Sequence, residues 1–383
     1  MMLREMLVVG VVVAIGLGGR QVEAQQAAAP AYRVKILRDL EYAKVGEKSL
    51  TLDLYLPEGV SGKLPVIIGI HGGGWAAGSK NGGMGSWLSR YGFAVAVINY
   101  RLSGEAIFPA QIQDCKASVR WLRAHADEYH LDPDRFGATG HSAGGHLVSL
   151  LATTGDVKEF DVGENLEFSS RIQAAAPSAG PTDLLKMDDH LPVAQRVRHN
   201  APNSPESRLI GGPIQDNPEK AGRANPIAYL SETTPPFLLI HGDQDQTVHW
   251  SQAKLLFDAL KDKKIWVHFH TVKGGGHMLG GPEIQTRTAA FFDEHLKGQA
   301  KSKAVVAELS ESSASTQAPA DRSRPAAGSA RGPAWGVVIQ RNDADGDGKL
   351  SREEFPSKNL FDRIDANGDG FVTKQEDESF RKQ

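Results

Sequence analysis

The stretch RFGATGHSAGGHLVSLLAT, residues 135–153, carries the pattern that decides the fold. Residues 136–139 are expected to form a short buried strand, and residues 145–153 an apolar helix. Between them lies G-x-S-x-G, the turn that lifts a serine hydroxyl out of a parallel sheet. The backbone turns so tightly there that Cβ atoms at Gly140 and Gly144 would clash, and Ser142 is expected in a strained conformation. The helix then directs its free N–H groups at any negative charge formed beside Ser142.

Apolar runs on both sides of this stretch predict the α/β class, a mostly parallel sheet with helices on both faces. Strands covered on both faces are expected at residues 66–70, 93–98, 172–176, 237–240 and 266–271. Helices are expected between them at residues 86–91 and 110–126, and a closing helix is expected at residues 284–296. Apolar and polar side chains alternate in residues 34–42 and 48–55, as in half-buried antiparallel strands.

The helix at residues 110–126 has the clearest amphipathic pattern. Its apolar side chains fall at helical spacing: Ile112, Cys115, Val119, Leu122 and Ala126. Its cationic side chains are expected on the surface: Lys116, Arg120 and Arg123. Cys115 is the only cysteine, so the chain can form no intramolecular disulfide, and we expect this side chain to be a small buried hydrophobe.

Length and charge limit the class of protein. A chain of 383 residues exceeds one ordinary domain, and its length predicts about two or three. The formal net charge is −3 and the isoelectric point is about 6.5. Without a basic stripe or a known nucleic-acid module, nucleic acid is not an expected partner. The oligomeric state stays open.

A signal peptide is expected at residues 1–24. Arg4 precedes an apolar run at residues 6–17, and Val22-Glu23-Ala24 resembles a small-residue cleavage site. The run is too short to span a bilayer, which needs about 20 residues. The sequence therefore predicts an exported protein, periplasmic or secreted, with no membrane attachment after cleavage. A retained anchor is the alternative.

Changes in pattern divide the rest of the chain. A first domain is expected at residues 35–297. Within it, the proline-rich residues 183–235 are expected to form a cap or insertion over the carboxyl edge of the sheet, where such sheets bind ligands. A disordered surface excursion is the alternative. Residues 298–332, rich in Ala, Ser, Arg, Lys and Pro, predict a flexible linker, and residues 333–383 form a separate small unit.

A serine hydroxyl is reactive when a histidine takes its proton and a carboxylate holds that histidine. Without these partners, the G-x-S-x-G segment would be a glycine-rich packing turn, which is the alternative interpretation. The expected order along the chain is Ser, then Asp or Glu, then His. Asp243 and Asp245 both follow the strand at residues 237–240. Asp245 is favoured because it lies further out on the loop, whereas Asp243 is expected to brace the turn.

His277 is the expected base, because the three glycines before it let the backbone bend over the serine. His268 and His270 share one face of a strand, where packed or surface histidines are the ordinary finding. His141 and His146 flank the serine turn and are expected to pack or to hydrogen-bond.

Fixed donors must point at the oxygen that becomes negative in the tetrahedral intermediate. The backbone N–H of Ala143, directly after the serine, is one candidate. Gly73 and Gly74 of the HGGG turn are expected to supply the others, since side chains there would block the acyl group. Trp75 is expected to form a wall of the pocket.

Two twelve-residue segments near the C-terminus resemble the loops of an EF-hand pair, which predicts a small all-α unit. Calcium takes about six to eight oxygen ligands, including both oxygens of a final Glu, and position 7 supplies a backbone carbonyl. The loops begin 22 residues apart, which favours a structural module over a sensor that opens a groove. Leu350 and Val372 occupy the apolar eighth positions, where paired loops can touch. The predicted calcium ligands are Asp343, Asp345, Asp347, Lys349, Ser351 and Glu354 in the first loop and Asp365, Asn367, Asp369, Phe371, Thr373 and Glu376 in the second.

Seven segments, in this order, together resemble the α/β-hydrolases: HGGGWAAGSK, NYRLS, FPAQIQDCKASVRWLRAHA, GHSAGGHL, NPIAYL, PPFLLIHGDQDQTV and GGGH. The resemblance covers about residues 35–297 and points to the bacterial feruloyl- and acetyl-esterase-like proteins, near the hormone-sensitive-lipase group of carboxylesterases. It implies the α/β-hydrolase fold, a triad of Ser142, Asp245 and His277, and an oxyanion hole of Gly73, Gly74 and Ala143.

The expected function is a serine carboxylic-ester hydrolase that works through an acyl-enzyme, needs no cofactor for catalysis and carries calcium in its tail. By resemblance, the expected substrates are acetyl or feruloyl esters of polysaccharides, or short-chain esters. Two alternatives stay open. One is a serine peptidase on the same fold, since a triad does not distinguish an amide from an ester. The other is a catalytically silent, calcium-dependent binding protein.

Overall fold

The computed structural model describes residues 32–190 and 198–298 and, in the C-terminal unit, residues 349–351, 355, 361, 364, 365, 367 and 369–376. The predicted signal peptide and almost all of the predicted linker lie outside the described residues. So do four of the predicted calcium ligands, Asp343, Asp345, Asp347 and Glu354. In the described part of the chain, no helix is long and apolar enough to cross a membrane.

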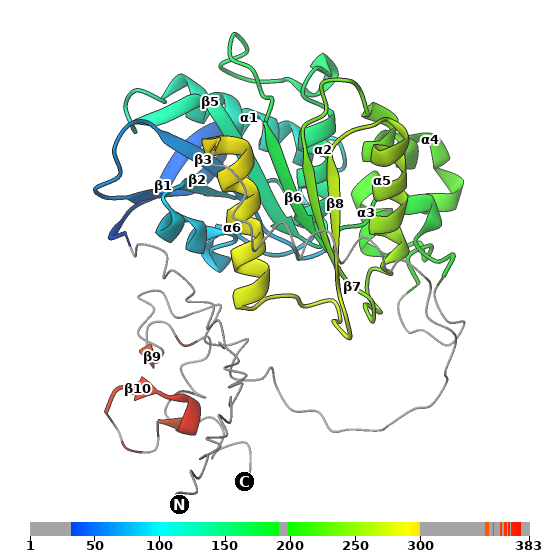
Figure 1. Ribbon diagram of the computed structural model, residues 1–383. Coiled ribbons are helices and arrows are strands. Elements are labelled where there is room, and N and C mark those ends of the chain that lie inside the picture. The colour runs from blue at the N-terminus through cyan, green and yellow to red at the C-terminus, as the bar shows by residue number, and fades with distance from the viewer. Residues whose placement is uncertain are drawn as a thin grey trace, which may run out of the picture.

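An eight-stranded, mostly parallel sheet forms the centre of the larger unit (Figure 1). Its order is β1-β2-β4-β3-β5-β6-β7-β8. The β1–β2 and β2–β4 pairs are antiparallel, and the other neighbours are parallel, as predicted. The strands are β1 (Val34–Val45), β2 (Lys48–Pro57), β3 (Leu64–Ile70), β4 (Ala94–Ile98), β5 (Leu131–His141), β6 (Ala174–Ser178), β7 (Phe237–Gly242) and β8 (Val267–Val272).

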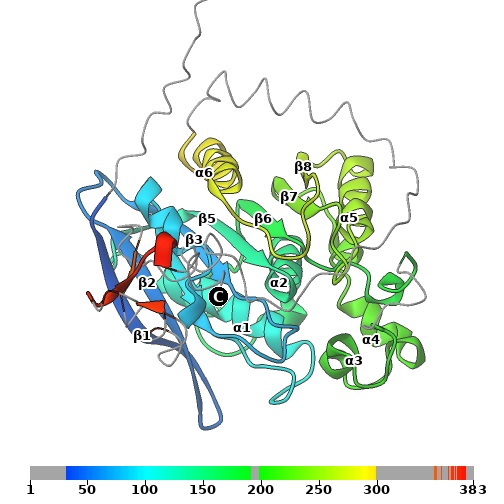
Figure 2. The ribbon, with the colours of Figure 1, turned by 90° about the horizontal axis from the view of Figure 1, so that it is seen from below.

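Helices cover both faces of this sheet (Figure 2). One face packs under α1 (Ala110–Ala124), α2 (Ala143–Thr153) and α5 (Ser251–Asp262). The other packs under α6 (Pro282–Lys297) and the short helix η2 (Ser86–Tyr91). Along β3, Val66 and Ile68 belong to the first core and Ile67 to the second, so the strand is buried on both sides. Such strands read as continuous apolar runs, which is why they could be predicted.

Helix α5 lies outside the predicted elements. Its buried Ala253, Leu256 and Leu260 follow a helical spacing, so the signal was present in the sequence. Strand β5 begins earlier than the predicted residue 136, because Leu131 pairs with Leu64 at the start of β3.

The predicted insertion, residues 183–235, consists in its described part of short helices. Proline begins three of them, a position where its missing N–H costs nothing. Buried Leu184, Leu209 and Ile214 join the core under α1 and α2. The helices are η4 (Leu184–Lys186), α3 (Pro205–Ile210), η5 (Ile214–Asp216), α4 (Pro218–Arg223) and η6 (Pro226–Tyr229); two others, η1 (Lys80–Gly82) and η3 (Lys158–Phe160), lie elsewhere.

The surface position predicted for Lys116 and Arg120 in α1 is wrong. Both side chains are buried and contact the carboxylate of Asp161, at 3.2 Å and 2.9 Å. The Lys116 ammonium also donates to the backbone carbonyls of Thr154 and Val157. The segment after α2 therefore supplies the carboxylate and carbonyl acceptors for the two buried cations.

Arg123, the third cation of α1, is also not a free surface group. Its guanidinium donates to the backbone carbonyls of Pro133, Ser169 and Arg171. It also lies 4.4 Å from the ring centre of Phe136. Cys115 is buried in α1, as predicted.

The C-terminal unit has a small core of its own, formed by Leu350, Phe355, Phe361, Ile364 and Val372. Strand β9 (Leu350–Ser351) pairs antiparallel with β10 (Phe371–Val372), and Leu350 lies opposite Val372. The contact predicted between the eighth positions of the two loops is therefore confirmed.

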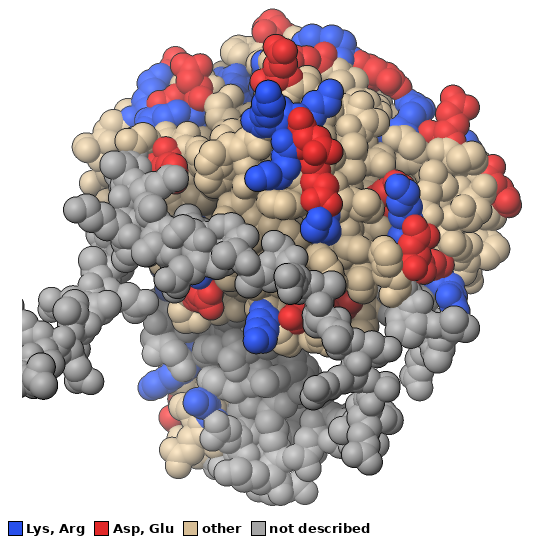
Figure 3. All heavy atoms as spheres, turned by 45° about the vertical axis from the view of Figure 1, so that its right-hand side comes forward, with Lys and Arg blue, Asp and Glu red and all other residues tan. Residues whose placement is uncertain are grey.

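Charged side chains of both signs are interspersed on the face shown in Figure 3. Exposed ion pairs also occur, such as that of Lys254 with Asp258 in α5 at 2.6 Å. Pairs of this kind contribute little to stability because water screens them.

We expect Asp161→Asn to lower the free energy of unfolding by about 3–5 kcal/mol, because Lys116 and Arg120 would keep buried charges without a carboxylate. Urea unfolding followed by tryptophan fluorescence measures the change. Asp258→Asn, which breaks an exposed pair, is the matched control and should change it by less than about 0.5 kcal/mol. Equal effects of the two substitutions would contradict the stabilising role of the buried cluster.

Candidate active site

Ser142 occupies a tight turn between β5 and α2. Its backbone angles are φ 57° and ψ −123°, a region that non-glycine residues rarely adopt. Its N–H donates to the carbonyl of Ser178 at 2.9 Å. A Cβ on Gly140 would lie 2.6 Å from the Gly144 carbonyl oxygen, and one on Gly144 only 2.1 Å from that of Ile70. The strain at Ser142 and the clashes predicted at both glycines are confirmed.

The structure brings Ser142, His277 and Asp245 together in one hydrogen-bonded line. Nε2 of His277 lies 3.0 Å from Oγ of Ser142, and Nδ1 lies 2.8 Å from Oδ2 of Asp245. The three residues come from the ends of β5, β7 and β8, which lie at the same edge of the sheet. An imidazole held in this way can take a proton from the serine hydroxyl.

Asp245 is buried, and several donors hold its carboxylate. Oδ1 accepts the backbone N–H groups of Thr247 and Val248 at 2.8 Å and 2.9 Å. Oδ2 also lies 3.2 Å from Nε2 of His241. Burial alone would raise the pKa of Asp245, but the hydrogen bonds from His241, His277 and Val248 outweigh it and lower the pKa below its usual value. The carboxylate therefore stays ionised beside His277.

His241 is a member of this site that the sequence analysis missed. It is fully buried, and its Nε2 also lies 2.8 Å from the carbonyl of Val248. Its position at the end of β7, four residues before Asp245, was the available signal. The side chain of Asp243 contacts the next loop instead of the His241-Gly242 turn: its Oδ1 accepts the N–H of Gly274 at 2.7 Å.

The competing histidines have other contacts. His146 is buried and its Nε2 lies 2.7 Å from the carbonyl of Ala224; burial lowers the pKa of His146 to about 4. His141 lies 3.4 Å from the Ser178 hydroxyl, and Nε2 of His270 lies 3.4 Å from Glu283. Packing and hydrogen bonding, as predicted for these side chains, account for their positions.

The HGGG turn follows β3 and lies beside the serine turn. Gly73 and Gly74 have φ values of 110° and 58°, which favour glycine. A Cβ on Gly73 would lie 2.3 Å from the carbonyl oxygen of Ala77, and one on Gly74 would lie 3.1 Å from the Cβ of Pro205 in the insertion. The pocket wall predicted at Trp75 is wrong: this side chain is 2% exposed and packs edge-on against His146 in the core.

The second EF-hand-like loop has its predicted ligands at Asp365, Asn367, Asp369, Phe371, Thr373 and Glu376. Gly370, at position 6, has a φ of 85°, and its N–H donates to Asp365 at 3.1 Å. Oε2 of Glu376 accepts hydrogen bonds from Thr373, whereas Oε1 is buried without a hydrogen-bond partner in the described part of the chain.

An unpaired carboxylate oxygen at position 12 fits a residue that gives both oxygens to calcium. Across the described residues, no group of three or more His, Cys, Asp or Glu side chains is close enough to hold a metal ion. In the first loop only Lys349 and Ser351 of the predicted ligands are described.

Comparison with known proteins gives two family matches. The BD-FAE family model matches residues 52–260, and the EF-hand model matches residues 339–355 and 358–376. Among curated proteins, the chain is 34% identical over 233 residues to the probable carboxylic ester hydrolase LipM of Mycobacterium tuberculosis, a match that covers 58% of this chain and 51% of LipM. The chain thus spans about half the length of the curated relatives it matches.

Matches to solved structures cover a larger share of this chain than the match to LipM does. A truncated carbohydrate esterase from gut microbiota is 33% identical with a TM-score of 0.63, and the match covers 70% of this chain and 99% of that one. An acetyl ester-xyloside bifunctional hydrolase from Caldicellulosiruptor lactoaceticus is 23% identical with a TM-score of 0.54, covering 71% and 95% of the two chains. The latter likeness shows a common fold only.

Proposed function

Because the chain belongs to the BD-FAE family of α/β-hydrolases and carries an EF-hand pair at its C-terminus, we propose that it is a serine carboxylic-ester hydrolase working through an acyl-enzyme. The observation that carries the proposal is the line from Ser142 through His277 to Asp245, with contacts of 3.0 Å and 2.8 Å. Relatives named as ester hydrolases support the same reaction class.

In the proposed reaction, Nε2 of His277 takes the proton of Ser142 as Oγ attacks the ester carbonyl. Asp245 accepts the Nδ1–H of His277 and stabilises the imidazolium that forms. His277 then gives its proton to the leaving alcohol, and the acyl group stays on Ser142. Water, activated by His277 in the same way, cleaves this acyl-enzyme and releases the acid.

The negative oxygen of the tetrahedral intermediate would be held by the backbone N–H groups of Gly73, Gly74 and Ala143. Two features support this role: Ala143 begins α2 at its positive dipole end, and the HGGG turn has no side chains that would block the acyl group. Fixed donors of this kind need no rearrangement as the charge develops.

For the substrate, we propose acetyl or feruloyl groups on polysaccharides, or short-chain esters. The name of the gut relative, a carbohydrate esterase, supports the first class. Export to the periplasm or beyond, through a signal peptide at residues 1–24, is part of the same proposal because polymeric substrates lie outside the cell. The apolar run at residues 6–17 supports it.

We further propose that calcium binds the EF-hand pair and takes no part in catalysis. When bound, the ion would order the two loops. The side-chain ligands would be Asp343, Asp345, Asp347, Ser351, Glu354, Asp365, Asn367, Asp369, Thr373 and Glu376, with backbone carbonyls from Lys349 and Phe371. Extracellular modules of this type bind calcium at about 10⁻⁴–10⁻³ M.

The proposed reaction predicts that Ser142→Ala lowers kcat at least ~10³-fold, because the acyl-enzyme cannot form. Initial rates on acetyl, butyryl, octanoyl and feruloyl esters and on acetylated xylan measure this and rank the substrates. Aminoacyl anilides in the same panel test the peptidase alternative. Near-normal ester hydrolysis by the variant would overturn the mechanism, and a wild type that hydrolyses no ester would favour the binding-protein alternative.

The two acids of the β7 loop provide a matched pair. Asp245→Asn should lower kcat by about 10³–10⁴-fold, because an amide at this position favours the wrong tautomer of His277. Asp243→Asn removes a charge but keeps an oxygen that can accept the Gly274 N–H, so it should lower kcat less than about tenfold. Steady-state rates of both variants on one ester compare them, and a larger loss at Asp243 would reverse the assignment.

Calcium added to chelator-treated protein should order residues 333–380 and change kcat little, since the predicted linker at residues 298–332 separates the two units. Limited proteolysis reports the ordering, and ester hydrolysis reports kcat. Glu376→Gln, which removes one carboxylate, should weaken the protection by calcium. A strict loss of hydrolysis in chelator, restored by calcium, would show that the units are coupled.

A further inference from the structure

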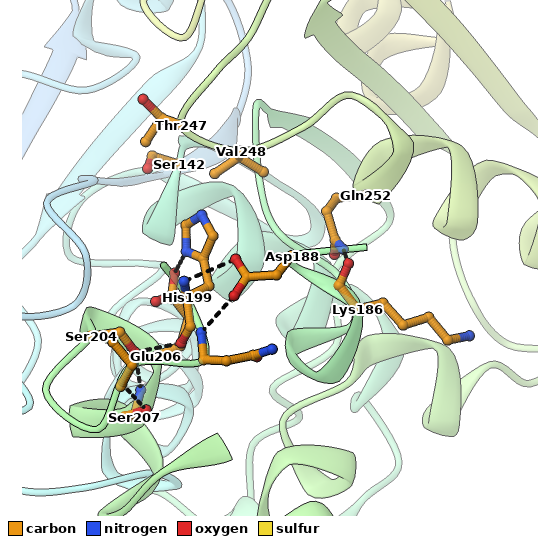
Figure 4. Close-up of polar contacts among 12 residues, drawn as sticks. Ser142, Lys186, Asp188, His199, Ser204, Glu206, Ser207, Thr247, Val248 and Gln252 are labelled. Carbon is orange, nitrogen blue, oxygen red and sulfur yellow. Dashed lines mark hydrogen bonds and ion pairs between the residues drawn. The ribbon is translucent and has the colours of Figure 1, made fainter. Parts of the chain in front are cut away.

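The insertion contains a buried histidine–carboxylate pair that the proposed reaction does not use (Figure 4). His199 and Glu206 are 2% and 4% exposed, and Nδ1 of His199 lies 2.8 Å from Oε1 of Glu206. Asp188 accepts the backbone N–H groups of His199 and Asn200 at 3.0 Å each. Apolar side chains could fill such a position at a lower desolvation cost, so the pair calls for an explanation beyond packing.

One side of the pair reaches the HGGG turn. Ser204 caps α3, accepting the N–H of Ser207 at 3.0 Å and donating to the carbonyl of His199 at 2.6 Å. Pro205, between this cap and Glu206, faces Gly74 so closely that a Cβ on Gly74 would lie 3.1 Å from the Cβ of Pro205. The segment that holds Glu206 in place therefore also lies beside Gly74, a proposed oxyanion donor.

The other side of the pair reaches the loop of Asp245. Nε2 of His199 is buried and, within the described residues, has no hydrogen-bond partner of normal geometry. In Figure 4 the ring lies between Glu206 and Thr247. The backbone carbonyl of Thr247 helps to raise the pKa of His199, and the N–H of Thr247 donates to Oδ1 of Asp245 at 2.8 Å. Thr247 thus lies between the ring of His199 and the carboxylate of Asp245.

The charge of the ring follows from its surroundings. Burial favours the neutral form, but the hydrogen bond and charge of Glu206, the charge of Asp188 and the Thr247 carbonyl outweigh it and raise the pKa of His199. An imidazolium has a donor on each nitrogen, whereas a neutral ring that donates to Glu206 turns a lone pair toward the Thr247 carbonyl. The protonated ring is therefore the form that both neighbours stabilise.

We propose that His199 and Glu206 are positioning residues: their ion pair holds the Asp245 loop and the HGGG turn against the insertion in the geometry that catalysis requires. Neither residue needs to touch the substrate. The inference rests on the proposed function, because these loops limit the rate only if Ser142 reacts through His277.

Glu206→Gln tests the ion pair while it keeps the volume of the side chain and an acceptor for Nδ1–H. Without the carboxylate, His199 should lose its proton at a lower pH. The kcat of the variant, relative to that of wild type, should therefore fall as the pH rises from about 5.5 to about 8.5. At the upper end the loss of kcat should be at least ~10-fold. KM for p-nitrophenyl acetate should change less than about threefold, because substrate contacts are intact.

Two further variants separate positioning from stability. Ser207 lies in the same helix as Glu206, and its hydroxyl donates to the Ala201 carbonyl at 2.8 Å. Ser207→Ala removes this hydrogen bond and should leave kcat nearly unchanged. His199→Gln has no titrating ring, so its loss of kcat should be the same at every pH. The proposal would be overturned if the kcat of Glu206→Gln, relative to that of wild type, did not change with pH, or if Ser207→Ala lost as much kcat as Glu206→Gln. It would also be overturned if His199→Gln kept the kcat of wild type, and this test holds even if Glu206→Gln fails to fold.

A fluorophosphonate probe separates this proposal from the proposed function. Its reaction with Ser142 needs the activated serine but no ester turnover. A wild type that reacts with the probe and hydrolyses no ester would disprove the esterase proposal only. Slower labelling of Glu206→Gln than of wild type at high pH would then still support the positioning role, and equal labelling would overturn it.

Discussion

The site depends on an approach of two backbones with no side chain between them. Gly144, at the start of α2, lies so close to β3 that a Cβ would be 2.1 Å from the carbonyl oxygen of Ile70. Gly140, on the neighbouring strand, pairs directly with Ile70 in the sheet. The HGGG turn begins at the residue after Ile70. The position of the serine relative to this turn is therefore set by sheet pairing and backbone contact, which are stiffer than a loop.

The same sheet explains how much of the site could be predicted. Parallel strands carry their carboxyl ends to one edge, so residues that follow β5, β7 and β8 were expected to meet there. Ser142, Asp245 and His277 do meet there, although Ser142 and His277 are 135 residues apart in the chain. The choice of Asp245 over Asp243 followed from distance along one loop, and in the structure Asp245 contacts His277 whereas Asp243 contacts Gly274.

Features that depend on pairs of distant polar residues could not be predicted. Lys116 and Arg120 look like surface residues because their acceptor, Asp161, lies on a loop 41 residues after Arg120. The ion pair of His199 with Glu206 lies in a segment without periodicity, so nothing in the pattern marks either residue as buried. Trp75 was expected at the pocket because of its neighbours in sequence, but the positive φ of 54° turns it into the core.

The packing of α6 also bears on how the protein is made. Phe292 and Leu296 press on Gly137 of the central strand β5, where a Cβ would lie 2.7 Å from the phenylalanine ring. Together with Ala289 and Phe291 they complete the second core of the sheet. A nascent chain therefore leaves this apolar face uncovered until residues 282–297 have left the ribosome. Until then the incomplete sheet exposes an apolar surface that chaperones can bind.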